Sequence, residues 1–255
     1  MKKALIYFTL IVGIIAIVGA CKSSEDDSST AATCAGMTTA AVTCLDAPAG
    51  SITGIDNSTW SGVYGTFHIF GIQGTAGVDN ATGCISAAAL VANLGGPTGT
   101  ASVIANRAVT SSSSIAHRFK YYSDTSCSTE IATISFGMTD VTVGDNVTGL
   151  TTSVDGSTYP SSATKVEHTN SCVKMKGSTA AGVTYLDNIF SGALDIVAGT
   201  EYSCQNSGEK EYFLINVLDT SAMTVGTDSI LYIEESDTAY PTDWTDDADT
   251  LTKLP

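Results

Sequence analysis

Turn-forming residues interrupt almost the whole chain after its first segment. Gly, Ser, Thr, Asp and Asn recur every few residues, and the runs between them are short and rich in β-branched and aromatic residues. Such runs predict many short strands, and the best candidates are 63–72, 116–122, 130–136, 165–169, 172–176, 212–218 and 229–234. Residues 212–218 are apolar on both faces, so we expect that strand to be the most buried. The pattern predicts an all-β fold, a single antiparallel β-barrel or sandwich.

Two segments depart from this pattern. The stretch from Cys84 to Gly95 is rich in Ala and Leu and stops at a Gly-Gly-Pro turn, and residues 180–190 form a second segment of this kind. Ala and Leu favour helices, and Gly followed by Pro ends them. We therefore expect one or two short helices beside the strands.

The first 21 residues have the features of a bacterial lipoprotein signal peptide. Lys2 and Lys3 precede an uncharged apolar run that ends in the Val-Gly-Ala-Cys motif of residues 18–21. A basic start and an apolar middle are typical of an export signal. The motif resembles the lipobox, the site at which bacterial lipoproteins are cleaved and acylated. The resemblance implies that residues 1–20 are removed and that Cys21 becomes the lipid-modified N-terminus.

The lipid would hold the protein on a membrane. An uncleaved membrane helix is the alternative, but the apolar run falls short of the roughly 20 residues that span a bilayer. Two or more acyl chains suffice for stable anchoring. Residues 22–33 carry no core-forming side chain and predict a flexible tether. By resemblance to lipoprotein sorting, Lys22 indicates the outer membrane. We expect a signal peptide at 1–20, a lipidated cysteine, tether and small cysteine loop at 21–50, and a β domain at 51–255.

The chain is strongly acidic, with 26 Asp and Glu, 11 Lys and Arg, and a net charge of −15 at pH 7. Removal of Lys2 and Lys3 with the signal peptide would leave nine basic residues and a net charge of −17. Nucleic-acid phosphates repel such a chain, so the composition argues against nucleic-acid binding.

Six cysteines remain when Cys21 is set aside. An even number in an exported chain predicts disulfides, and the absence of CxxC argues against a redox pair or a zinc knuckle. The sequence does not choose among the pairings. We predict bonds between neighbours along the chain, namely Cys34 with Cys44, Cys84 with Cys127 and Cys172 with Cys204. Each would stabilise the fold by roughly 2–4 kcal/mol.

Short motifs of the β domain resemble those of a family of exported bacterial proteins with lipocalin-like barrels. The matching segments, in order, are Thr59-Trp60, Tyr122 to Cys127, Ala163 to Val166, Tyr212 to Asn216, Leu231-Tyr232 and Pro241-Thr242. The chain departs from the family at Tyr240, where an Arg would precede Pro-Thr, and at Cys84, which follows a long insertion. The resemblance implies a barrel that binds apolar ligands in its mouth, and it carries no catalytic or ligand residues.

Candidate binding residues have ordinary structural explanations. Trp60, Tyr64, Phe67 and Phe70 could line a ligand pocket, but filling a β core explains them as well. The ligand-binding residues therefore stay unknown at this point. None of the motifs GxSxG, HExxH, GxGxxG or the P-loop occurs, so we predict that the protein is not an enzyme.

The candidate metal-binding residues also have ordinary structural explanations. His68, His117 and His168 lie far apart without metal-ligand spacing, so we interpret them as unrelated strand residues. Ten acids and no base lie between Glu211 and Thr252 and could bind calcium, yet a solvated acidic segment explains them equally. We predict no metal and no cofactor.

The leading hypothesis is a lipid-anchored, non-enzymatic binding module for an apolar small molecule or lipid. A surface interaction protein, adhesin-like or structural, is the alternative, because Thr/Ser/Gly richness and acidity suit an envelope or surface partner. A secreted hydrolase is a third reading, and it requires a polar cleft with a His beside a Ser or Asp.

Overall fold

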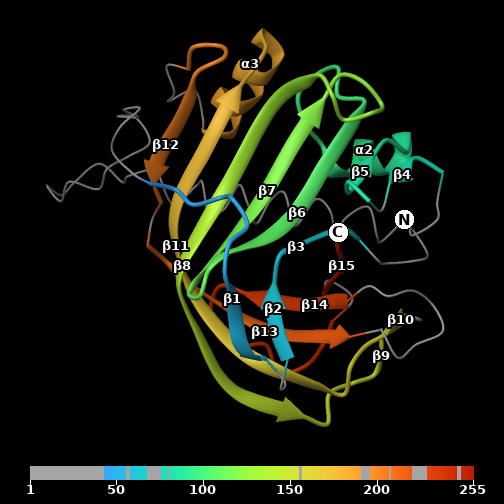
Figure 1. Ribbon diagram of the computed structural model, residues 1–255, viewed down its shortest axis with the longest axis vertical. Helices are drawn as coiled ribbons and strands as arrows, with labels where there is room; N and C mark the ends of the chain where they lie inside the picture. Colours follow the sequence, from blue (N-terminus) through green and yellow to red (C-terminus); the bar gives the residue numbers. More distant parts are fainter. Residues whose placement is uncertain are drawn as a thin grey trace, which may run out of the picture.

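Eight antiparallel strands close into a barrel in the computed structural model (Figure 1). The model describes residues 43–55, 58–67, 76–79, 81–154, 157–190, 196–206, 208–219, 229–245 and 248–255. The barrel strands are β3 (Val63–Phe67), β6 (Ser102–Ser111), β7 (Ser114–Tyr122), β8 (Glu130–Thr148), β11 (Ser162–Gly177), β13 (Lys210–Asp219), β14 (Ser229–Ser236) and β15 (Asp249–Lys253). Their order is β3-β15-β14-β13-β11-β8-β7-β6, and the pairing of β3 with β6 closes the ring. The predicted all-β class and the barrel are confirmed.

The strand β11 corrects one prediction. The sequence pattern separates it into two strands, 165–169 and 172–176, whereas the structure has a single bent strand. Its pairing with β8 shifts register three times, between Thr164 and Val166, between Glu167 and Thr169, and between Asn170 and Cys172. Such bulges change which residues face the core. Val166 and His168 face inward before the last of these shifts, and Val173 faces inward after it, so no single alternation runs through the strand.

Beyond the end of β13, β11 pairs with β12 (Glu201–Gln205) instead. The long strands β8 and β11 therefore extend past the short strands β13 to β15, as the upper half of Figure 1 shows. Two further strand pairs, β4 (Val78–Asp79) with β5 (Cys84–Ile85) and β9 (Ser153–Val154) with β10 (Ser157–Thr158), flank the barrel.

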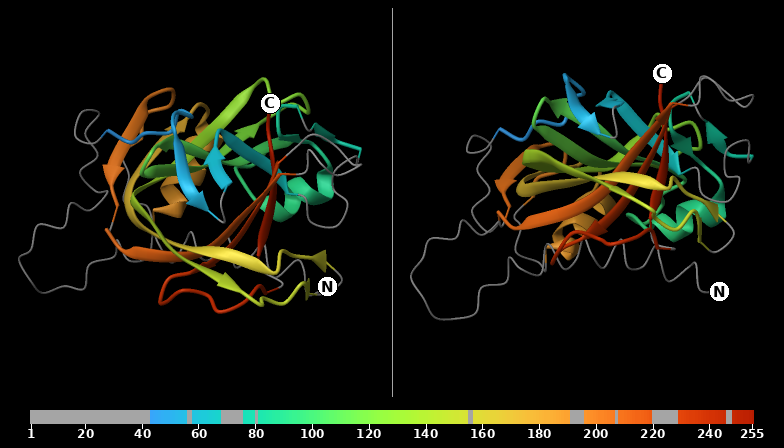
Figure 2. Two further views of the ribbon diagram at one scale, coloured as in Figure 1. Left: turned by 60° about the horizontal axis from the view of Figure 1, so that its bottom comes forward. Right: turned by 90° about the horizontal axis from the view of Figure 1, so that it is seen from below.

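A hairpin of β1 (Ser51–Ile55) and β2 (Ser58–Ser61) packs onto the barrel and contacts β6, β8 and β13. Figure 2 shows it inside the outline of the ring when the barrel is turned toward its end. Ile52, Ile55 and Trp60 of the hairpin are fully buried in the main core. The hairpin therefore fills this end of the barrel with apolar side chains.

The two short helices of the described chain are α2 (Ala88–Leu94) and α3 (Ala180–Ile189). Both predicted helical segments are thus confirmed, except that Cys84 and Ile85 form a strand before α2. Thr179 caps α3 by accepting a hydrogen bond from the Gly182 amide at 3.2 Å, as N-cap threonines commonly do. Leu186 and Phe190 then reach the core on this side.

The disulfides only partly follow the predicted pairing. Cys84 is bonded to Cys127 as predicted, but Cys172 is bonded to Cys44. The predicted Cys34–Cys44 and Cys172–Cys204 bonds are therefore wrong. Cys204 lies opposite Val173 on the neighbouring strand, and successive strand residues face opposite sides, so Cys172 and Cys204 point away from each other. Cys34 and Cys21 lie outside the described residues.

Candidate functional site

A belt of ionisable side chains crosses the interior of the barrel. Its members occupy inward-facing positions that alternate with core residues on six of the eight strands. We call this the charged belt: Arg107 (β6), His117 (β7), His168 (β11), Glu211 (β13), Glu235 (β14) and Asp249 (β15). Tyr64 of β3 lies beside Arg107 in the sheet and is fully buried.

Arg107 carries the positive charge of the belt. Its side chain is 1% exposed, and Nη2 donates to Glu235 and, at 3.2 Å, to Asp249. Burial opposes its charge, but the charges of Glu235 and Asp249 outweigh burial and raise the pKa of Arg107. Nε and Nη1 are buried and have no hydrogen-bond acceptor among the described residues. Buried donors normally have partners, so these two point to an acceptor that is not part of the described chain.

The pair of His168 and Glu211 lies beside Arg107. His168 Nε2 is 3.6 Å from Glu211 Oε2, and Asn170 donates to Glu211 Oε1 at 2.7 Å. Burial and the charge of Arg107 lower the pKa of His168 to about 3, and burial, with the charge of Glu235, raises the pKa of Glu211 to about 7. Both side chains are therefore neutral at mildly acidic pH. Burial likewise lowers the pKa of His117 and raises that of Asp249 to about 6.

Replacing Glu211 with glutamine is expected to stabilise the fold by about 3 kcal/mol at pH 8 and to have little effect at pH 4. The folded pKa of about 7 exceeds the ordinary 4.5, so the unfolded chain loses its proton first as pH rises. The wild-type fold therefore loses stability between these two values, whereas glutamine does not titrate and keeps the Asn170 bond. Urea unfolding at both pH values measures the difference. Asp145→Asn on the exposed end of β8 is the control, and equal effects of Glu211→Gln at both pH values would contradict the assignment.

The predicted histidines come only partly together. His117 and His168 both face the barrel interior, and each makes a tilted ring contact with a phenylalanine, Phe119 at 4.5 Å and Phe213 at 4.4 Å between ring centres. His68 lies outside the described residues. Within the part of the chain that the structure describes, no group of three or more His, Cys, Asp or Glu is arranged to hold a metal ion.

The acidic segment uses its carboxylates as structural acceptors where it is described. Glu234 accepts hydrogen bonds from the Thr245 amide and hydroxyl, and Asp243 accepts from Thr151.

Of the predicted aromatic cluster, Trp60 and Tyr64 are buried in the core, while Phe70 and the side chain of Phe67 lie outside the described part. The core explanation therefore holds for the two aromatics that can be placed.

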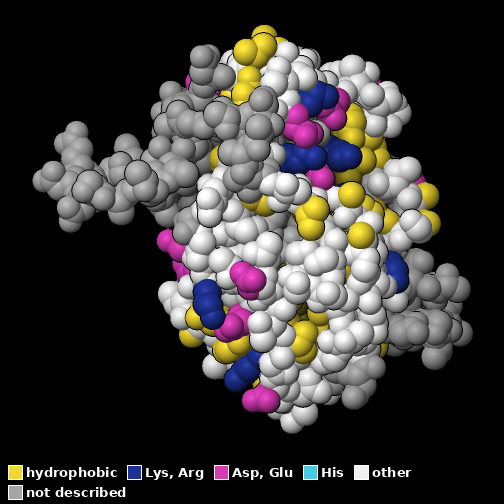
Figure 3. Space-filling view, turned by 60° about the vertical axis from the view of Figure 1, so that its left-hand side comes forward, with side chains coloured by type: hydrophobic (Ala, Val, Ile, Leu, Met, Phe, Trp, Pro, Cys, Tyr) yellow, Lys and Arg dark blue, Asp and Glu magenta, His cyan; other side chains and the backbone are white. Residues whose placement is uncertain are grey.

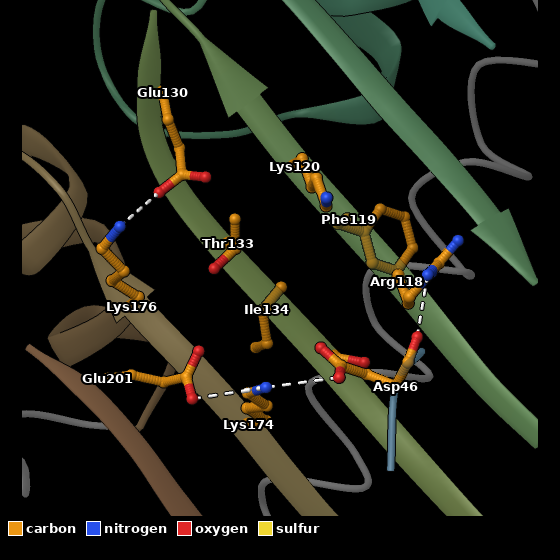
Figure 4. A pocket seen from close by; sticks show the side chains of 11 residues that line it. Asp46, Arg118, Phe119, Lys120, Glu130, Thr133, Ile134, Lys174, Lys176 and Glu201 are labelled. Carbon is orange, nitrogen blue, oxygen red and sulfur yellow. Dashed lines mark hydrogen bonds and ion pairs between the residues drawn. The ribbon is translucent and has the colours of Figure 1, made fainter. Parts of the chain in front are cut away.

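A second cluster lies on the outer face of the barrel wall. β7, β8 and β11 present two parallel rows there, in which a hydroxyl on the middle strand lies between two basic side chains. We call these six residues the basic array: Arg118, Ser135 and Lys174 in one row, and Lys120, Thr133 and Lys176 in the next. Figure 3 shows basic and acidic side chains gathered on the upper part of this face, and Figure 4 labels those that line the pocket.

The pocket over the basic array has a volume of about 170 Å³. Asp46, Glu130 and Glu201 stand around it: Lys174 bonds Asp46 at 3.2 Å and Glu201 at 3.3 Å, and Lys176 bonds Glu130 at 3.1 Å. Asp46 follows closely on Cys44, which is bonded to Cys172 in the adjacent row. Gly137, opposite Cys172, is required there, because a Cβ would lie 2.5 Å from Cys172 Sγ and 2.8 Å from Cys44 Sγ.

Neither cluster was predicted as a site. For the charged belt, the sequence signal is Arg107, since it lies on the apolar face of a run whose alternate positions are Val103, Ala105 and Val109. No protein-family model and no curated protein matches the chain. None of the described helices is long and apolar enough to cross a membrane.

Proposed function

We propose that this protein is an exported, non-enzymatic binding module, anchored to the outer membrane through acylated Cys21, whose barrel interior binds an apolar small molecule or lipid. The anchor is supported by the basic start, the apolar run and the Val-Gly-Ala-Cys motif. The binding role is supported by the closed barrel, an architecture that can hold one small ligand.

One observation carries the binding role: Arg107 is buried inside the barrel, and its Nε and Nη1 have no acceptor in the part of the chain that the structure describes. An acceptor-bearing head group would satisfy both donors while an apolar body packs among the core side chains. The charged belt already contains three carboxylates to one guanidinium, so an uncharged ester or hydroxyl suits it better than another acid. The ligand class is therefore a single-chain lipid with a neutral, oxygen-bearing head.

Native mass spectrometry of the purified protein with monododecanoylglycerol tests this proposal. We expect a one-to-one adduct, and at least ten-fold weaker binding by Arg107→Lys, which keeps the charge but lacks the guanidinium fork. Lys165→Met, on the outer side of β11, is the control and should bind normally. Absence of an adduct with the wild-type protein, or equal adducts with Arg107→Lys, would refute the binding role.

Replacing Cys21 with serine is expected to abolish both acylation and cleavage, because the sulfur is the atom that carries the lipid. The variant should accumulate as the precursor with residues 1–20 attached. Metabolic labelling with palmitate and the mass of the N-terminal peptide check this in cells, with Cys204→Ser as the matched cysteine control. Normal processing of the Cys21 variant that remained sensitive to globomycin would overturn the lipoprotein assignment.

A further inference from the structure

The basic array is unusual for so acidic a protein. The chain has a net charge of −15, yet four of the eight Lys and Arg among the described residues gather here, facing three carboxylates. Neighbouring strands lie about 4.8 Å apart, so the two basic side chains of a row start about 10 Å apart, and the two rows are separated by about 7 Å. Figure 4 shows the four basic side chains around a small area, with the carboxylates of Asp46, Glu130 and Glu201 among them.

Ser135 marks the centre of this area. Ser135 is 5% exposed and lines the pocket between Arg118 and Lys174, and its buried hydroxyl has no hydrogen-bond partner among the described residues. A buried hydroxyl without a partner costs free energy, and a ligand acceptor over the pocket floor would remove that cost. The unpartnered hydroxyl therefore points to a ligand, and it does so independently of the gathered basic side chains.

Two of the basic side chains have hydrogen-bond donors that are not used within the described part of the chain. Lys120 is half-buried and makes no hydrogen bond or ion pair with the described residues. Arg118 donates from Nε to Asn106 and from Nη1 to the Asp46 carbonyl, which leaves Nη2 unused. Glu201 is 56% exposed, and exposed ion pairs contribute little, so an incoming anion displaces it from Lys174 at small cost.

Size and charge select the kind of anion. Drug-sized ligands need pockets of roughly 300–1,000 Å³, so about 170 Å³ suits a single small group. A carboxylate has two acceptor oxygens, whereas a terminal phosphate has three and a charge of about −1.5 to −2 at pH 7. The three oxygens of a phosphate match two hydroxyls and the flanking basic donors better than the two oxygens of a carboxylate do.

We propose that the basic array binds a phosphate group, with Ser135 and Thr133 donating to its oxygens and Arg118, Lys120, Lys174 and Lys176 neutralising its charge. The group comes either from a membrane lipid head or from free phosphate. This site lies on the outer face of the wall and does not depend on the proposed ligand inside the barrel.

Lysine acetylation footprinting of the purified, lipidated protein tests the proposal. In one arm, the protein in neutral detergent receives inorganic phosphate or, at equal ionic strength, sodium chloride. In the other arm, it is inserted into phosphatidylcholine vesicles with or without phosphatidic acid, whose head group is a terminal phosphate. Mass spectrometry reads the acetylation of Lys120 and Lys176, and Lys165 serves as the internal control.

We expect acetylation of Lys120 and Lys176 to fall about ten-fold in at least one arm while Lys165 is unaffected. Protection by inorganic phosphate identifies a soluble source, and protection only with phosphatidic acid identifies a lipid head. Ser135→Ala should fold with an equal or higher Tm, because its buried hydroxyl has no hydrogen-bond partner among the described residues, yet require about ten-fold more phosphate for the same protection. Protection in neither arm, or undiminished protection in Ser135→Ala, would overturn the proposal.

Discussion

Replacing Arg107 with methionine is expected to destabilise the barrel by about 3–5 kcal/mol. Methionine fills much of the volume, but it leaves the carboxyl of Asp249, 8% exposed, without its cation in the interior. Such a carboxyl must either stay charged without a partner or take up a proton. The loss should therefore be smaller at pH 5 than at pH 8, because protonation relieves it at low pH.

Urea unfolding measured at both pH values checks this expectation. Lys210→Met is the control, since its ion pair with Glu167 is at the surface, with the lysine side chain 57% exposed, and should contribute less than about 1 kcal/mol. Adding Asp249→Asn to Arg107→Met should recover part of the loss. A cost below that of the surface control would show that the ion pairs of the charged belt do not hold the strands together.

Removing the Cys44–Cys172 disulfide by alanine substitution of both cysteines is expected to cost about 5 kcal/mol by the chain-entropy relation. The bond joins residues 128 positions apart, and the entropy of the unfolded chain rises with the length of the released loop. The same substitution at Cys84 and Cys127, 43 positions apart, should cost about 4 kcal/mol.

Chemical denaturation of the two double variants gives the comparison. The Cys44–Cys172 bond also holds the segment that carries Asp46 against the basic array, so its removal should increase acetylation of Lys174, which pairs with Asp46. Removal of the Cys84–Cys127 bond should leave Lys174 unchanged. A larger loss of stability at Cys84–Cys127, or no change at Lys174, would contradict these roles.

Most of the strands could be predicted because their burial follows the local alternation. Residues 212–218 are the clearest example, since β13 is apolar on both sides and Phe213, Leu214 and Ile215 are fully buried. The strand β6 was missed, because Asn106 and Arg107 interrupt its apolar run and no local rule shows that both will be buried. The three register shifts between β11 and β8 were missed for a similar reason, since they depend on which residues of the two strands become partners.

The candidate sites could not be predicted, because their members are distant in the chain. Arg107 and Asp249 are 142 residues apart, and only closure of the ring brings them together. In the basic array, the alternation of Lys174 and Lys176 is visible in the sequence. Their position beside Ser135 and Thr133 requires the pairing of β11 with β8.

The sequence by itself determined the all-β class and the two short helices, because turn residues and helix-forming runs act over short stretches of chain. The tertiary structure alone decided the Cys44–Cys172 bond, the burial of Arg107 and the rows of the basic array. Each of these depends on which strands become neighbours, and strand order and register are set by the packing of the whole barrel.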